Sequence, residues 1–156
     1  MDASESVLLL AEDNADHAEL VLRCLEAQPI RHRVVHLSDG EAALNYLTRR
    51  PPFEEPTAAP TPRLVLLDLR LPKVDGLDVL RAIKTSPDLR AIPVVILTTS
   101  AADRDVAGAY AAHANSYLVK PLDADRLGRM LRDVGRYWLG WNRLPEGASG
   151  GREPPE

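Results

Sequence analysis

The sequence predicts an α/β fold in which helices cover both faces of a five-stranded parallel sheet. Short, continuous apolar runs are typical of strands buried on both faces, and segments with helical spacing of apolar residues alternate with them along the chain. Several of these runs also end in polar side chains, as expected where the carboxyl ends of parallel strands border a crevice. At 156 residues, the chain has the length of one domain.

The first third of the chain predicts two strand–helix units. An apolar strand over residues 7–11 precedes a helix over about 16–28, which Asn14 can cap and Pro29 ends. A second strand near 32–37 precedes a helix that opens at Ser38, where Glu41 completes the spacing of a capping box.

A proline-rich loop separates these units from the third strand. Five of the 13 prolines lie between residues 50 and 63, and proline fixes φ and removes an amide donor, so this stretch predicts an extended loop. The third strand is expected at 64–67, followed by a helix that Asp75 can cap and that ends before Pro87. The fourth strand is expected at 94–97.

The last third predicts two more helices around a fifth strand at 116–119. The fourth helix opens with a second capping-box spacing, Ser100 to Asp103, and the fifth runs from about 123 to 139. One side of the fifth helix is apolar and the other basic; these sides hold Leu127, Met130, Leu131, Val134 and Trp138, and Arg126, Arg129, Arg132 and Arg136. We expect a domain over residues 5–140 and a tail over 141–156 that serves first as an interface and is flexible at its end.

Polar side chains follow four of the predicted strands. Asp68 follows the third strand, Glu12 and Asp13 follow the first, Thr98 the fourth and Lys120 the fifth. Because parallel strands end at the same edge of the sheet, we expect these groups to meet there. A carboxylate at such a position is suited to nucleophilic attack.

This combination, spread over most of the chain, resembles the receiver domain of two-component response regulators. The spacing agrees, with 30 residues from Asp68 to Thr98 (98 − 68) and 52 to Lys120 (120 − 68). The resemblance implies a flavodoxin-like, doubly wound (βα)5 fold with strand order 2-1-3-4-5. The flanking motifs are most similar to small response regulators that accompany phytochromes; they are Leu71-Pro72 with Asp75-Gly76, Leu97-Thr98-Thr99-Ser100, Tyr117-Leu118-Val119-Lys120-Pro121 and Tyr137-Trp138-Leu139.

The resemblance implies a role for each site residue. Asp68 is the phospho-acceptor, Lys120 binds the phosphoryl group, Thr98 and Tyr117 form the conformational switch, and Mg²⁺ is held by Glu12, Asp13, Asp68 and the backbone carbonyl of Arg70. Two like charges about 4 Å apart repel by roughly 4 kcal/mol at an effective dielectric near 20, so an anionic phosphoryl group beside three acids needs such a cation. A cis peptide bond between Lys120 and Pro121 is also implied.

The implied function is a single-domain response regulator in a phosphorelay. It accepts phosphoryl from a sensor histidine kinase, expected to be a bacteriophytochrome, and is not a turnover enzyme. We expect the kinase to dock over the first helix and the loop after Lys120, with contacts from Ala15, Ala18, Pro121 and Leu122. We also expect a homodimer through the fourth helix, fifth strand and fifth helix.

Composition limits the ligands and the cellular compartment that we expect for this chain. The net charge of −4 gives no support to nucleic-acid binding, which usually needs a basic surface. Cys24 has no partner for an internal disulfide, which suits a reducing compartment. No signal-peptide pattern and no apolar stretch long enough to span a bilayer is present, so we expect a cytoplasmic protein.

Other readings of the same residues remain open. A Mg²⁺-dependent phosphohydrolase of the haloacid-dehalogenase type also uses a strand-end Asp, but needs a second Asp where Arg70 stands. A flavodoxin-like nucleotide or flavin module would need a glycine-rich loop or stacking aromatics, and a non-phosphorylated interaction module is the third alternative. Taken singly, Tyr117 is ordinary packing and Lys120 a solvated charge. The four histidines show no ligand spacing and read as structural or exposed; they are His17, His32, His36 and His113.

Overall fold

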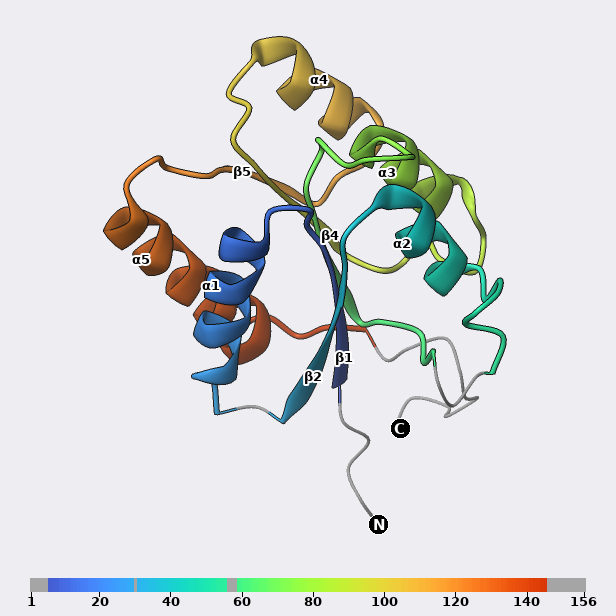
Figure 1. Ribbon diagram of the computed structural model, residues 1–156, viewed down its shortest axis with the longest axis horizontal. Coiled ribbons are helices and arrows are strands. Elements are labelled where there is room, and N and C mark those ends of the chain that lie inside the picture. Colours follow the sequence, from blue (N-terminus) through green and yellow to red (C-terminus); the bar gives the residue numbers. More distant parts are fainter. Residues whose placement is uncertain (1–5, 30, 56–58, 146–156) are drawn as a thin grey trace.

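Five parallel strands form one sheet in the order β2-β1-β3-β4-β5 in the computed structural model, which describes residues 6–29, 31–55 and 59–145 (Figure 1). The strands are β1 Ser6–Ala11, β2 His32–Leu37, β3 Leu64–Leu67, β4 Val94–Thr98 and β5 Ser116–Val119. This architecture and strand order confirm the predicted fold class.

Helices cover both faces of the sheet, with α1 and α5 on one side and α2, α3 and α4 on the other (Figure 1). They are α1 Ala15–Glu26, α2 Gly40–Leu47, α3 Gly76–Thr85, α4 Asp103–Ala111 and α5 Ala124–Gly135. Alternate strand side chains enter the two layers: Leu8 and Leu10 pack with α1 and α5, whereas Leu9 and Ala11 pack with the other helices. Every residue of β1, β3 and β4 is therefore buried, which explains their continuous apolar runs.

Helix starts follow the expected caps in part. Asn14 caps α1 and Asp123 caps α5 through their side-chain oxygens. The cap of α2 is Asp39 instead of Ser38, and its carboxylate accepts from the backbone N–H of Ala42 at 2.7 Å. The capping box predicted at Ser38 was therefore wrong by one residue.

The predicted start of α4 was also wrong. Ala102 occupies the cap position, and its methyl side chain cannot accept a cap bond; the Ser100 hydroxyl, two residues earlier, donates to the carboxylate of Asp105. Asp75 does stand at the cap position of α3, although its side chain makes no cap bond.

The C-terminal part of the domain returns to the start of the sheet. After α5 the chain continues as a π-helix, η1 Arg136–Trp141. Arg63, just before β3, donates to the carbonyl oxygens of Leu144 and Pro145 at 3.0 and 3.2 Å and to the Ser6 hydroxyl at 2.8 Å. Residues 146–156, most of the predicted tail, lie outside the described residues.

The structure also bears on the expected Lys120–Pro121 peptide bond and on membrane-spanning helices. The peptide bond between Lys120 and Pro121 is trans, the form that most X–Pro bonds adopt, so the implied cis bond was wrong. Within the described residues, no helix is both long enough and apolar enough to cross a membrane.

Candidate functional site

The sheet register brings the predicted site residues to one edge. The backbone N–H of Asp68 donates to the carbonyl oxygen of Ala11 at 3.0 Å, which continues the β1–β3 ladder by one step. In the same way, the N–H of Lys120 donates to the carbonyl oxygen of Thr98 at 2.7 Å at the end of the β4–β5 ladder. The carboxyl ends of four strands thus present their side chains together.

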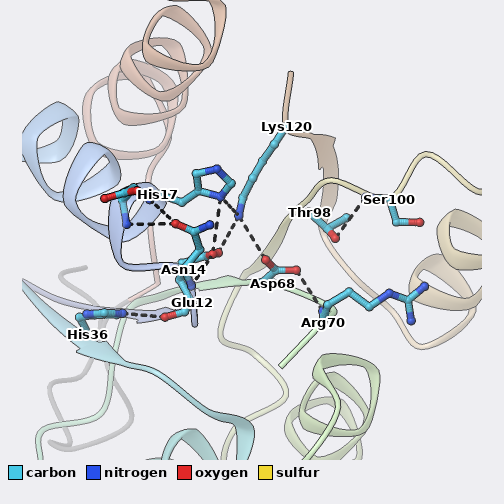
Figure 2. A network of polar contacts seen from close by, with 10 residues as sticks. Glu12, Asn14, His17, His36, Asp68, Arg70, Thr98, Ser100 and Lys120 are labelled. Atoms are coloured by element: carbon cyan, nitrogen blue, oxygen red, sulfur yellow. Dashed lines mark hydrogen bonds and ion pairs between the residues drawn. The ribbon is translucent and has the colours of Figure 1, made fainter. Parts of the chain in front are cut away.

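The ammonium group of Lys120 lies between two carboxylates (Figure 2). Its Nζ is 2.6 Å from Glu12 Oε2 and 3.1 Å from Asp68 Oδ2. All three side chains are buried. Removing one member of such a group would leave an uncompensated buried charge, so Lys120 and the two acids hold each other in place.

Three acidic side chains gather at this edge of the sheet. Carboxylate oxygens of Glu12, Asp13 and Asp68 all lie within 4.8 Å of one another, with Asp13 exposed and the other two buried. The group therefore has an excess of negative charge after Lys120 is counted. Closely spaced carboxylate oxygens are the ligands that hard divalent cations prefer, so these residues fit a divalent metal ion.

Burial governs the charge state of Glu12. Desolvation raises its pKa to about 7, although the hydrogen bond and charge of Lys120 act to lower it. The backbone around Glu12 is fixed as well: its Oε1 accepts from the N–H of Asn14 at 3.2 Å, and its carbonyl oxygen lies 2.8 Å from His36 Nε2.

The loop after β3 turns the side chain of Arg70 away from Asp68 (Figure 2). The backbone N–H of Arg70 donates to Asp68 Oδ1 at 3.0 Å, but its guanidinium pairs with Asp105 Oδ2 at 2.8 Å, in the first turn of α4. The same carboxylate accepts the hydroxyl of Ser100. Residues from the loops after β3 and β4 are thereby linked to α4.

The two predicted switch residues, Thr98 and Tyr117, lie beside the loop after β4. Thr98 is fully buried, and its hydroxyl accepts from the backbone N–H of Ser100 at 3.4 Å. The Tyr117 hydroxyl donates to the carbonyl oxygen of Ser100 at 2.9 Å, and burial raises the pKa of this phenol. Both therefore contact the loop after β4.

The sequence interpretation missed His17 and Asp105. Nδ1 of His17 lies 3.3 Å from Lys120 Nζ, although the sequence suggested only a structural or exposed histidine. Its place in the first turn of a helix that follows a strand-end acid pair was the available signal. Asp105 carries no such signal, since its partners lie 5 and 35 residues away.

A groove of about 330 Å³ opens beside the site, between α1 and the loop from β5 to α5. His17, Leu20 and Arg23 line it from α1, and Pro121 and Leu122 from the loop. Leu122 is 99% exposed, so an apolar side chain stands free next to the buried acids.

Comparison with known proteins places the chain in a family. The family model described as the response regulator receiver domain matches residues 8–132. The probable methanogenesis regulatory protein FilR2 of Methanothrix harundinacea (strain 6Ac) is 52% identical over 139 residues, which cover 89% of this chain and 87% of FilR2. The response regulator Rcp1 of Synechocystis sp. (strain ATCC 27184 / PCC 6803 / Kazusa) is 42% identical over 139 residues, or 89% of this chain and 92% of Rcp1.

Solved structures agree with the sequence comparison. The Mn²⁺-bound form of Rcp1 superposes with a TM-score of 0.86 at 41% identity, covering 90% of this chain and 99% of that one. The phosphorylated cyanobacterial phytochrome response regulator RcpA gives a TM-score of 0.86 at 35% identity, covering 92% of this chain and 100% of that one. With its acidic cluster and buried lysine at the carboxyl edge of a 2-1-3-4-5 sheet, the chain belongs to the response regulator receiver domain family.

Proposed function

We propose that this protein is a single-domain response regulator and that Asp68 accepts a phosphoryl group from a sensor histidine kinase. The observation that carries the proposal is the placement of the Asp68 carboxylate, buried at the end of β3 and 3.1 Å from the Lys120 ammonium. One Asp68 oxygen forms a bond to phosphorus as the P–N bond of a phosphohistidine breaks. The imidazole nitrogen leaves with the electron pair of that bond.

The metal of this site is proposed to be Mg²⁺. Asp13, Asp68 and the backbone carbonyl of Arg70 would hold it directly, and Glu12 would act through a bound water. The short separation of the acidic oxygens supports this assignment, as does the Mn²⁺ in the structure of Rcp1. Bound there, the ion supplies positive charge that offsets the acids and the phosphoryl oxygens.

Three further residues complete the proposal. Lys120 would neutralise one phosphoryl oxygen as a point charge, and the hydroxyl of Thr98 would donate to another. Thr98 and Tyr117 both contact the loop at Ser100, so a movement of Thr98 toward the phosphoryl group would be felt by Tyr117. Donors that find their acceptor only after phosphorylation shift a conformational equilibrium.

Intact-mass measurement with Mg²⁺ and phosphoramidate tests the assignment of Asp68. We expect one phosphoryl group on the wild type and none on Asp68→Asn, because the amide keeps the size of the carboxylate but is a poor nucleophile. Asp78→Asn, on the exposed face of α3, is the matched control and should label normally. Stable labelling of Asp68→Asn would reject the assignment, and rapid consumption of the donor without labelled protein would favour a hydrolase.

The kinase is proposed to dock in the groove between α1 and the β5–α5 loop. Pro121 and Leu122 line this groove and exposed Ala15 lies at the start of α1, so these three are the proposed contacts. Ala18 is 2% exposed and packs in the core, so its expected contact was wrong. Leu122→Glu should slow transfer from the kinase and leave uptake from phosphoramidate unchanged. Equal loss with both donors would mean that the site itself had been damaged.

The remaining assignments belong to the same proposal. Similarity to RcpA, a cyanobacterial phytochrome response regulator, supports a phytochrome as the kinase, and we propose a bacteriophytochrome. The one cysteine, Cys24, has a free and buried thiol, which supports a cytoplasmic location. We further propose a receiver domain over residues 5–140 with a tail over 141–156, and a homodimer through α4, β5 and α5.

A further inference from the structure

The three donors of the Lys120 ammonium have three acceptors in the structure. Two are the carboxylates of Glu12 and Asp68, at 2.6 and 3.1 Å, and the third is His17 Nδ1, at 3.3 Å (Figure 2). An ammonium has three N–H groups and no lone pair, so this set uses all of them. Lys120 is 3% exposed, and the role of its third partner is not explained by the metal or by the nucleophile.

His17 is held firmly by the start of α1. It is the third residue of the helix, and its backbone N–H donates to the capping oxygen of Asn14 at 3.1 Å. From there the ring reaches Lys120, while the rest of the side chain, 30% exposed, lines the groove beside Pro121 and Leu122. The ring thus stands between the groove and the buried ammonium.

The ring can accept from Lys120 only when Nδ1 carries no proton. A neutral ring with its hydrogen on Nε2 meets this condition. The carboxylate of Glu12 lies farther away, at 3.8 Å from Nδ1, so Lys120 is the nearer partner.

We propose that His17 is a positioning residue that holds the Lys120 ammonium beside Asp68 for phosphoryl transfer. The inference rests on the proposed phosphorylation of Asp68. The lysine side chain has four rotatable bonds and would otherwise be drawn toward Glu12, its shortest contact. With Glu12 and His17 holding two donors from different sides, the donor that now meets Asp68 stays aimed at the place where the phosphoryl oxygens arrive.

Three substitutions separate the acceptor atom from the bulk of the ring. Asparagine places an amide oxygen where Nδ1 stands, glutamine places its polar atoms where Nε2 stands, and leucine fills space without any acceptor. We expect the rate of phosphoryl uptake from phosphoramidate with Mg²⁺ to fall about three- to tenfold in His17→Leu and His17→Gln, the size of effect expected for the loss of one ordinary hydrogen bond when the other two remain. His17→Asn should stay within about twofold of the wild type, because it restores the acceptor.

The outcomes are distinct. Wild-type rates in His17→Leu and His17→Gln would overturn the proposal, and so would an equal loss in all three variants, because the ring would then act only by packing. In either case labelling of the wild-type protein on Asp68 leaves the proposed function standing.

A second measurement reads the contact without phosphorylation. The ¹⁵N shifts of the His17 ring report its tautomer, and we expect the neutral form with hydrogen on Nε2 in the wild type near pH 7.5. In Lys120→Met the donor to Nδ1 is gone and the two tautomers should mix. A hydrogen on Nδ1 in the wild type would overturn the inference even if Asp68 proved not to be phosphorylated.

Discussion

At the scale of single residues, the charge of Glu12 depends on a competition between burial and its ion pair. The side chain is 2% exposed and 2.6 Å from the Lys120 ammonium, yet its pKa rises to about 7, since desolvation exceeds the stabilisation by Lys120. Near neutral pH a proton and a divalent cation therefore compete for the same acidic group. The cation binds more tightly at pH values at which Glu12 has already lost its proton.

This competition predicts that Mg²⁺ affinity depends on pH. The pKa of Glu12 is raised from 4.5 to about 7, so the carboxyl group is mostly ionised at pH 8 and mostly protonated at pH 6. Affinity should fall as pH drops through 7, by up to about tenfold between pH 8 and pH 6, because one proton must then be displaced. Calorimetric titrations with Mg²⁺ at the two pH values measure the change. Glu12→Gln should bind Mg²⁺ more weakly but equally at both, and a wild type with equal affinities would contradict the competition.

Residue types at strand ends were readable from the sequence, whereas side-chain conformations were not. Glu12, Asp68 and Lys120 each follow a continuous apolar run, so the parallel sheet alone brings them to one edge. The contact of His17 with Lys120 joins residues 103 positions apart and depends on two rotamers. No spacing rule encodes it.

At the scale of elements, the loop from β3 to α3 is packed too closely for side chains at two glycines. A Cβ on Gly76 would lie 2.1 Å from the carbonyl oxygen of Asp68, and one on Gly40 would lie 1.8 Å from that of Val74. Backbone atoms cannot yield as a flexible side chain can. The loop that carries Asp68 and Arg70 is therefore clamped between the first turns of α2 and α3.

Alanine substitution should distinguish Gly76, where the loop is closely packed, from Gly108, an ordinary glycine inside a helix. Gly76→Ala is expected to lower the free energy of unfolding by roughly 1–3 kcal/mol or more through overpacking, and to slow phosphoryl uptake by displacing Asp68. Gly108→Ala, within α4, is the matched control, since a Cβ at Gly108 would meet only Leu77 Cδ2, at 3.8 Å. This substitution should raise the free energy of unfolding by about 0.5–1 kcal/mol. Urea unfolding of the wild type and the two variants measures both changes in the free energy of unfolding. A Gly76→Ala protein as stable as the wild type would show that the loop yields.

Helices were predicted well where one periodic face and one cap agree, and less well where polar side chains have competing partners. Asn14 caps α1 as expected, and Asp123, at the predicted start of the fifth helix, caps α5, because the oxygens of both side chains accept from neighbouring N–H groups. Ser100 instead donates to Asp105, and the capping box predicted there fails because α4 begins after Ala102. In the π-helix at 136–141 the buried residue is Leu139, five positions after Val134, whereas Trp138, predicted on the apolar side from the α-helical period, is only partly buried.

At the scale of the whole molecule, polar contacts join the site to distant parts of the chain. Arg70, Ser100 and Tyr117 connect the edge that holds Asp68 to α4 and β5 through Asp105 and the Ser100 carbonyl. Exposed apolar side chains stand on these same elements, with Tyr110 on α4 52% exposed and Val119 on β5 41% exposed. A change at Asp68 thus has a physical route to a surface suited to association.

The structure alters which charges could support the proposed dimer. The first turn of α4 holds two acids, Asp103 and Asp105; Asp105 already pairs with Arg70 and is 17% exposed, so exposed Asp103 is the one left to face a partner. Arg129, Arg132 and Arg136 are exposed on α5 and its continuation, although Arg136 lies 3.9 Å from Asp133. Exposed ion pairs contribute only about 0–1 kcal/mol each, so apolar contacts of Tyr110 and Val119, with Trp141 at 80% exposure, must supply most of the affinity.

Charge reversal tests this arrangement. In a two-fold contact each Asp103 meets the basic face of the other copy, so Arg132→Glu with Arg136→Glu should weaken association about tenfold or more, as two ion pairs of about 0.5 kcal/mol become repulsions of similar size. Arg81→Glu with Arg90→Glu, exposed on and just after α3, makes the same change of charge away from this surface and should leave association intact. Sedimentation at micromolar concentration, with and without phosphoramidate, measures all three proteins. A wild type that is monomeric under both conditions would rule out the dimer, and equal association of both variants would place the interface elsewhere. Because Tyr117 contacts the Ser100 loop and belongs to β5, phosphorylation should change the association constant of the wild type.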